Sequence, residues 1–177
     1  MPHHPLLLVL VALLALQACV VRDRRTLGAI IDDQTIEMKA GAAIVGDANL
    51  KKMTHVNVTS MNGIVLLTGE AASPEARDQI LTRLRAINGV RRITNELRIT
   101  EPSAIGARSR DTLITTAVKS RLAVTRGIDP ARVKVVTEDS VVYLMGLVTQ
   151  REGELAAEQA ATIDGVARVV KIFEFVD

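Results

Sequence analysis

The pattern of apolar blocks and glycines in this chain recurs after a shift of 77 residues. The stretch 64–69 falls on 141–146, and both stretches end in glycine. After a one-residue deletion, Ile-Asn-Gly-Val at 87–90 falls on Ile-Asp-Gly-Val at 163–166. Because the glycines and the apolar blocks keep their order, chance similarity is a poor explanation. The sequence therefore predicts two copies of one small folding unit.

Each copy is predicted to contain a helix, two strands, a second helix and a third strand. Asn62–Gly63 is a strong signal for a two-residue hairpin, because both central positions of a type I′ turn need a positive φ, and Asp139–Ser140 is its weaker counterpart. Ser73–Pro74 predicts a helix start, with serine as the cap and proline in the first turn. The prediction is an α+β fold in which each αββαβ copy has its own core and a three-stranded mixed sheet with two helices on one face.

Four single residues have expected places in this pattern. Gly69 and Gly146 are predicted to end the second strand of each copy, where the absence of a Cβ permits a sharp exit. Leu84 and Ile163 are predicted on the buried stripes of the second helices.

The N-terminal region has the features of an export signal. The apolar run Leu6–Leu16 is too short to span a bilayer core of ~30 Å and is typical of a signal peptide. It ends in Leu16–Cys19, which has the Leu-x-Ala-Cys form of bacterial lipoprotein signals. An ordinary secreted protein is the alternative, but it would keep the only cysteine of the chain as an unpaired thiol. We therefore predict a signal peptide at 1–18, lipidation of Cys19 and a tether at 19–35.

A set of stretches in the second copy carries a resemblance to a known domain: 111–122, 133–139 and 145–152. Together with the duplication and the Gly-Val pair before each last strand, they resemble the BON domain. The resemblance implies one BON domain at 36–100, a linker at 101–110 and a second BON domain at 111–177.

A lipoprotein signal followed by two such units resembles the dual-BON outer-membrane lipoproteins. That resemblance implies a protein that is held by its acyl chains at the periplasmic face of the outer membrane and maintains the integrity of the envelope. It also implies that the second BON domain binds anionic phospholipid, of the phosphatidylglycerol type.

The segment 113–126 suits a helix with two different faces. At about 100° per residue, Ile114, Val118 and Leu122 share one side and are expected to pack on the sheet. Thr112 or Asp111 is expected to cap the start of the helix. The opposite side is small and apolar with cations beside it, a pattern that can lie in a lipid interface. The predicted phospholipid-binding residues are Leu113, Thr116, Lys119, Ser120, Ala123, Val124 and Arg126. A plain solvent-facing helix is the alternative, because hydroxyl side chains lie on the same side.

Motifs for catalysis are missing from the sequence. His55 is the only histidine beyond the predicted signal peptide, and no cluster of His, Cys, Asp or Glu has the spacing of a zinc site. The glycines Gly41 and Gly46 are followed by Asp47 instead of the Lys-Ser/Thr of a phosphate-binding loop. We therefore expect a binding module that is not an enzyme, with no catalytic residue, no metal and no cofactor.

Charge and aromatic content argue against nucleic acid as a partner. The chain has 22 Lys and Arg against 20 Asp and Glu, one Tyr, two Phe and no Trp, so it lacks both a basic excess and stacking platforms. The charge is uneven, since residues 36–99 carry nine basic and six acidic side chains, and residues 111–177 carry eight and ten. The basic group Arg91, Arg92 and Arg98 marks a solvated surface, a contact with an envelope protein or a contact with the second domain.

Two functions of different classes stay open at this point. In the first, the protein is an envelope-maintenance lipoprotein whose second BON domain binds anionic phospholipid. In the second, it is a periplasmic protein–protein adaptor that attends the outer-membrane protein assembly machinery, and lipid contact is incidental.

Overall fold

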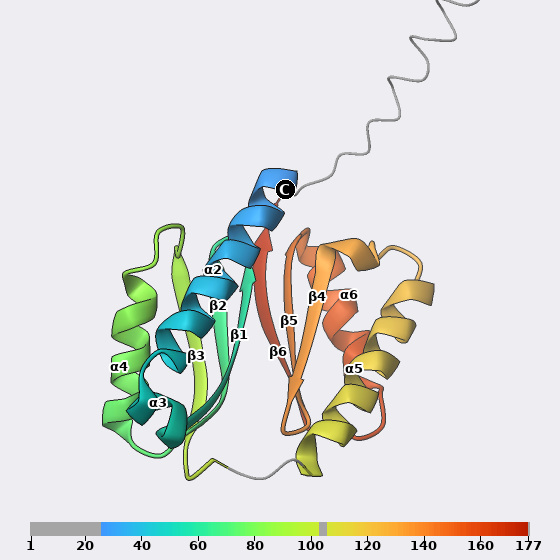
Figure 1. Ribbon diagram of the computed structural model, residues 1–177. Coiled ribbons are helices and arrows are strands. Elements are labelled where there is room, and N and C mark those ends of the chain that lie inside the picture. Colours follow the sequence, from blue (N-terminus) through green and yellow to red (C-terminus); the bar gives the residue numbers. More distant parts are fainter. Residues whose placement is uncertain (1–25, 103–105, 177) are drawn as a thin grey trace, which may run out of the picture.

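The computed structural model describes residues 26–102 and 106–176. They form two units that lie side by side, each with a sheet and flanking helices (Figure 1). The predicted signal peptide and Cys19 lie outside the described residues, so lipidation at Cys19 stays a prediction.

The first unit, domain 1, has one short helix more than expected. Its elements are α2 (Leu27–Val45), α3 (Ala48–Met53), β1 (Thr54–Met61), β2 (Ile64–Ala71), α4 (Pro74–Arg85) and β3 (Arg92–Ile99). Strand β2 is central, antiparallel to β1 and parallel to β3. The predicted hairpin is present, because Asn62 and Gly63 have φ values of 53° and 72°. Ser73 caps α4 by accepting a hydrogen bond from the Ala76 N–H (3.2 Å).

The second unit, domain 2, repeats this order. Its elements are α5 (Gly106–Val124), the 3₁₀ turn η1 (Pro130–Arg132), β4 (Val133–Glu138), β5 (Val141–Val148), α6 (Gln150–Ala161) and β6 (Arg168–Phe175). Strand β5 is central, antiparallel to β4 and parallel to β6. Asp139 and Ser140 have φ values of 50° and 63°, so the weaker hairpin signal is also correct. The predicted α+β class is confirmed, with a mixed three-stranded sheet in each copy.

The first helix of each domain begins earlier than the sequence predicted. Helix α2 starts at Leu27, where Thr26 caps it by accepting a hydrogen bond from the Ala29 N–H (3.1 Å). Residues 27–35, which were assigned to the tether, are therefore helical. Helix α5 starts at Gly106, inside the predicted linker. The apolar periodicity marks only the turns that pack on the sheet, whereas the first turns of α2 are mostly exposed to solvent.

Each domain has a core between its sheet and its helices. In domain 1, Ile36 and Ala40 of α2 and Leu84 of α4 are buried there, and Leu84 lies where the sequence placed it. Ile163 is half-buried and lies beyond the end of α6 at Ala161, so its predicted place on that helix was wrong.

Gly69 and Gly146 lie two residues before the ends of β2 and β5, so the prediction that they end the strands was wrong. A side chain at Gly69 would overlap the carbonyl oxygen of His55. A Cβ at Gly146 would come within 2.6 Å of the carbonyl oxygen of Arg132. Both glycines therefore allow the neighbouring backbone to approach closely, and the strands continue past them.

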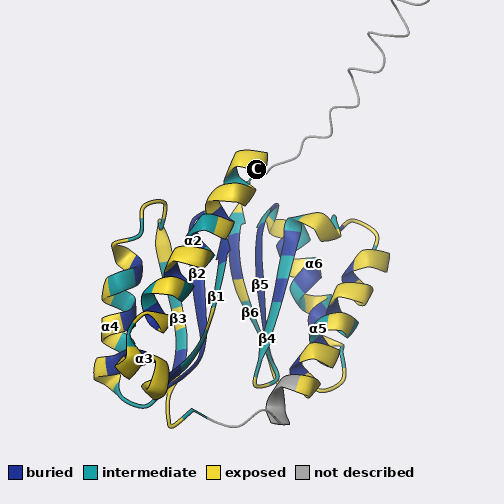
Figure 2. Ribbon diagram, viewed as in Figure 1, coloured by how far each residue is buried: buried dark blue, intermediate teal, exposed yellow. Residues whose placement is uncertain are grey.

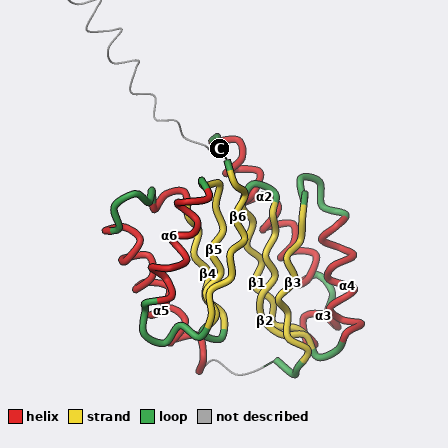
Figure 3. Tube along the Cα trace, turned by 180° about the vertical axis from the view of Figure 1, so that it is seen from behind, coloured by secondary structure: helices red, strands yellow, loops and turns green. Residues whose placement is uncertain are grey.

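The two sheets pack face to face through a third core, which the sequence analysis did not anticipate. Its buried side chains lie on the strand faces opposite to the helices: Met61, Ile64, Leu66, Tyr143, Met145 and Ile172. Figure 2 shows the buried residues concentrated in the strands and the exposed ones on the outer helices. Seen from behind in Figure 3, the strands of both domains lie in the middle with helices outside them. The order of layers is thus helices, sheet, sheet, helices.

Candidate lipid-binding site

Helix α5 presents the predicted lipid-binding residues on the side that faces away from its sheet. The inward residues Ile114, Val118 and Leu122 are buried, as predicted, and they set how the helix is rotated about its axis. With these three on the sheet, Leu113 and Val124 project into solvent and are 71% and 81% exposed. No helix among the described residues is long and apolar enough to span a bilayer.

The other predicted residues are exposed around the same outward face: Thr116, Lys119, Ser120 and Ala123 on α5 and Arg126 in the turn after it. The Thr116 hydroxyl donates to the Thr112 carbonyl oxygen (2.9 Å), so its hydrogen bond is made inside the helix. We call this surface, with Leu113 and Val124, the α5 outer face. The structure therefore brings all seven predicted residues together on one surface.

Asp111 lies inside α5 and is not the cap that the sequence predicted. Its buried carboxylate accepts hydrogen bonds from the backbone N–H groups of Asp139 (2.8 Å) and Ser140 (2.9 Å), at the hairpin between β4 and β5. This contact ties the helix to its own sheet and so fixes the direction of the α5 outer face.

A polar cleft of about 420 Å³ opens beside the α5 outer face. Its lining residues come from β1, α5 and β4: Asn57, Asp111, Thr112, Thr115, Thr116, Lys119, Thr137 and Glu138. The hydroxyls of Thr115 and Thr137 are hydrogen-bonded (2.7 Å), and the Asn57 amide donates to the Glu138 carboxylate (2.9 Å). Thr116 and Lys119 belong to both the cleft and the outer face, so the two are continuous.

Sequence reasoning missed this cleft because its walls come from both domains. Asn57 is in domain 1, and nothing in a single sequence places it beside α5. One usable signal was present, since Thr112, Thr115 and Thr116 are spaced so that they share one side of a helix. Within residues 26–102 and 106–176, no group of three or more His, Cys, Asp and Glu side chains could hold a metal ion.

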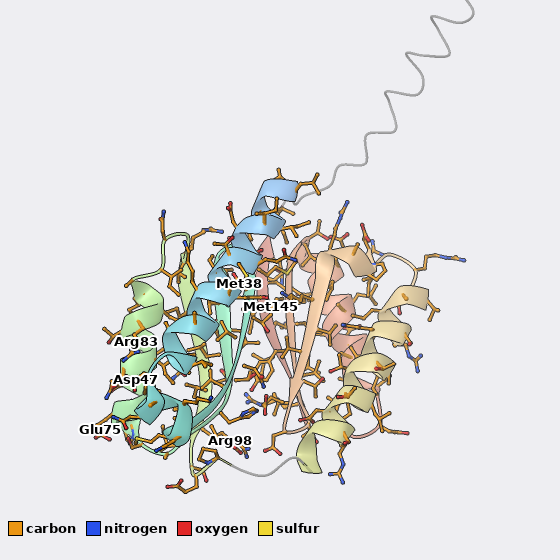
Figure 4. The ribbon with its side chains drawn as sticks, in the orientation of Figure 1. Met38, Asp47, Glu75, Arg83, Arg98 and Met145 are labelled. Carbon is orange, nitrogen blue, oxygen red and sulfur yellow. The ribbon has the colours of Figure 1, made fainter. Side chains whose placement is uncertain are left out.

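Arginines of domain 1 reach acidic residues of domain 2 beside the third core. The Arg91 guanidinium donates to both carboxylate oxygens of Glu174, at 2.8 and 3.1 Å. The Arg98 guanidinium donates to Asp139 (2.7 Å), and it lies at the end of domain 1 near the linker in Figure 4. Of the three explanations for the basic group, contact with the second domain is therefore correct for these two arginines.

A further contact joins the domains where β1 faces β4. The Lys134 ammonium donates to the Glu37 carboxylate (2.8 Å) and to the Ser60 carbonyl oxygen (3.0 Å). Together with the arginine pairs, this contact adds ion pairs between the domains beside the third core. These contacts hold the two domains together, so the outer helices of both domains belong to one packed structure.

The pKa values of two ionisable side chains, Tyr143 and Glu174, are shifted by the packing of the two sheets on one another. Burial, with the nearby Glu96 carboxylate, raises the pKa of Tyr143 to about 12. Burial alone would raise the pKa of Glu174, but hydrogen bonds from Arg91 and Asn62 outweigh it and hold that pKa below its usual value. Both effects depend on contacts across the domain interface.

Comparison with known proteins identifies both units. The family model of the BON domain matches residues 32–101 and 110–176, one match for each αββαβ unit. The chain belongs to the BON-domain family.

Relatives that align with most of the chain include a lipoprotein. The chain is 37% identical over 163 residues to the outer membrane lipoprotein DolP of Haemophilus influenzae, which covers 92% of this chain and 84% of that protein. It is 35% identical over 154 residues to the 21 kDa hemolysin of Actinobacillus pleuropneumoniae, with 87% and 79% covered. The protein is thus an outer-membrane lipoprotein with two BON domains, as the sequence predicted.

Among solved structures, the C-terminal domain of CdsD, the structural protein of the type III secretion system of Chlamydia trachomatis, aligns with 82% of this chain and 67% of that one. The TM-score is 0.32 at 14% identity.

Proposed function

We propose that this protein is a non-enzymatic lipoprotein at the periplasmic face of the outer membrane that maintains envelope integrity, with BON domain 2 binding anionic phospholipid. Acyl chains on Cys19 hold it at the bilayer. The observation that carries the proposal is the α5 outer face, where Leu113 and Val124 are largely exposed and Lys119 and Arg126 lie beside them.

The energetics suit a surface that works together with an anchor. Each Lys or Arg near an anionic membrane contributes about 1 kcal/mol, so Lys119 and Arg126 give weak binding by themselves. An acyl chain that already holds the protein at the bilayer raises the local concentration of headgroups at the α5 outer face. A weak, salt-sensitive contact then suffices to orient domain 2.

The cleft beside the α5 outer face suits a lipid headgroup that carries uncharged hydroxyls. Two carboxylates, Asp111 and Glu138, line it, so a second anionic group deep inside would be repelled. We assign the lipid phosphate to the rim, near Lys119. The glycerol hydroxyls of phosphatidylglycerol would enter the cleft and exchange hydrogen bonds with Thr112 and Asn57, whereas the extra carboxylate of phosphatidylserine would not fit there.

Flotation of residues 20–177 with vesicles tests the proposal. We expect binding to phosphatidylcholine vesicles that contain phosphatidylglycerol, less binding when phosphatidylserine replaces it, and little binding to phosphatidylcholine alone. Binding should weaken in high salt, because the ion atmosphere screens exposed charges. Equal binding to all three lipids, or none, would contradict the proposal and favour the adaptor function, whose partner would be the outer-membrane protein assembly machinery.

A charge-matched pair of variants locates the effect. Lys119→Glu on the α5 outer face should reduce binding to phosphatidylglycerol vesicles several-fold. Lys171→Glu changes an exposed lysine of β6 by the same charge and should have little effect. Equal losses in the two variants would show that only net charge matters.

The anchor is tested separately. Mass spectrometry of the mature protein should find acyl chains on Cys19, and Cys19→Ala should give an unprocessed or soluble product. Recovery of the wild-type protein in the soluble periplasm without acyl chains would contradict the anchor.

A further inference from the structure

Helix α2 of domain 1 has an apolar stripe that faces solvent. Leu27, Ile31, Met38 and Val45 are 80%, 62%, 70% and 58% exposed. Their spacings of four, seven and seven residues place them along one line of an α-helix, about 27 Å long at ~1.5 Å per residue. We call these four residues the α2 stripe. Figure 4 labels Met38 on this helix.

The α2 stripe lies opposite the buried side of the same helix, where Ile36, Ala40 and Ile44 pack on the sheet. The charged side chains of α2 lie off the stripe: Asp32, Asp33, Glu37 and Lys39. Glu37 is engaged with Lys134, and the Asp33 carboxylate accepts from the β1–β2 hairpin. The uncharged Gln34 lies on the same side between Ile31 and Met38. Four large exposed apolar side chains on one uncharged side of a helix mark an interaction surface, unlike scattered single apolar residues.

The internal repeat shows that the fold does not require this stripe. A shift of 78 residues places α2 on α5, and inward residues then match inward residues, as with Ile36 and Ile114. On the outward side, Met38 falls on Thr116 and Val45 falls on Ala123. The two helices therefore bury similar side chains but expose large apolar groups at different positions, with the four stripe residues on α2 and Leu113 and Val124 on α5.

The position of the anchor favours a lipid surface as the occupant. Leu27 comes eight positions after Cys19, which is at most about 29 Å at full extension. An acyl chain on Cys19 would keep the start of α2 at the membrane, and the α2 stripe begins at Leu27 itself. The segment between Cys19 and Leu27 also has three arginines against one aspartate in its sequence, and a basic sequence next to an acyl anchor favours an anionic bilayer surface.

We propose that the α2 stripe is a second lipid-contact surface, which lies in the headgroup region of the bilayer to which the anchor attaches. The contact rests on acylation of Cys19 and is independent of lipid binding by α5. It would place domain 1 directly on the membrane, with the helix axis close to the bilayer plane.

A single-tryptophan experiment tests this contact, because the chain contains no tryptophan. The acylated full-length protein carrying Met38→Trp is placed in vesicles with brominated phospholipid, which quenches tryptophan within the bilayer. The matched control is Gln79→Trp, at an exposed position of α4. A third variant, Leu113→Trp, reports the α5 outer face.

We expect Met38→Trp to shift its emission to the blue in vesicles and to be quenched by bromine at least twofold more than Gln79→Trp. Quenching of Met38→Trp no greater than that of Gln79→Trp would overturn the proposal. A blue shift that appears without lipid and grows with protein concentration would assign the α2 stripe to a second copy of the chain and would also overturn it. Quenching of Leu113→Trp alone would support lipid binding by α5 and overturn the second contact. Quenching of Met38→Trp alone would support the second contact and contradict lipid binding by α5.

Discussion

Asp33 and Asp111, which lie 78 residues apart in the sequence, make the same contact in the two domains. Each is a buried carboxylate on the first helix of its domain, and each accepts hydrogen bonds from both backbone N–H groups of the following hairpin turn. Asp33 also accepts from the Ser60 hydroxyl (2.7 Å). The duplicated unit therefore has a built-in clamp between its first helix and its first hairpin, and this clamp sets the direction in which each helix faces.

Removing either clamp should destabilise the protein. Asp33→Ala and Asp111→Ala each leave two partly or fully buried N–H groups of the hairpin without their acceptor, at a cost of about 1–3 kcal/mol in the free energy of unfolding. Asp33→Ala should cost more, since the Ser60 hydroxyl also loses its acceptor. Urea denaturation measures the change, and the control Asp164→Ala, at an exposed position, should stay within about 0.5 kcal/mol of the wild type. Clamp variants as stable as this control would show that the hydrogen bonds do not hold the fold.

Two methionines test the third core against the outer surface. Met145 is fully buried between the sheets, whereas Met38 is exposed on α2 (Figure 4). Met145→Ala should lower the free energy of unfolding by about 2–5 kcal/mol, and Met38→Ala should change it little. Equal effects in a denaturant titration would mean that the two sheets are not packed on one another.

The single tyrosine of the chain reports whether the domains stay together. In the assembled protein, burial raises the pKa of Tyr143 to about 12, against about 10 for an exposed tyrosine. The ultraviolet absorbance of tyrosinate should therefore rise only well above pH 10 in the native protein. In urea it should rise near pH 10. A native titration near pH 10 would show that Tyr143 is exposed and the domains are apart.

The apolar periodicity and the turn residues predicted each domain from the sequence, because those signals are local. The packing of one sheet on the other is not local, yet it left a trace. Strand β5 reads Val-Val-Tyr-Leu-Met, without the polar alternation of a strand that has one face in water. Such a continuous run indicates burial on both faces. Pairing each sheet with the helices of its own domain predicts only one buried face for β5.

For the site too, the local features were predictable from the sequence and the long-range contacts were not. The outward position of Leu113 follows from helix geometry once Val118 is assigned to the core. The clamp by Asp111 and the cleft wall at Asn57 depend on residues far apart in the sequence, which helix periodicity does not reveal. The same holds for Glu174, whose partner Arg91 is in the other domain.

The pair formed by Arg91 and Glu174 predicts a dependence of stability on pH. The folded-state pKa of Glu174 is below its unfolded value, so its contribution is present above the unfolded pKa, about 4.3, and is lost as the pH falls through the folded one. Glu174→Gln should remove up to about 1 kcal/mol at pH 7, the range for partly exposed ion pairs. Urea denaturation should show that the difference between variant and wild type shrinks from pH 6 to pH 3. A constant difference would contradict the role of the carboxylate charge.

The central claim is that the α5 outer face contacts anionic lipid, and one substitution on it tests this most directly. Leu113→Glu puts a carboxylate where an apolar contact and an anionic headgroup are expected, at a position exposed enough to leave folding intact. The matched control is Ile99→Glu, an exposed apolar residue at the end of β3. In flotation of residues 20–177 with phosphatidylglycerol vesicles, we predict that Leu113→Glu loses at least about tenfold in binding, equivalent to ~1.4 kcal/mol, while Ile99→Glu binds as the wild type does. Full binding by a folded Leu113→Glu protein would contradict the account.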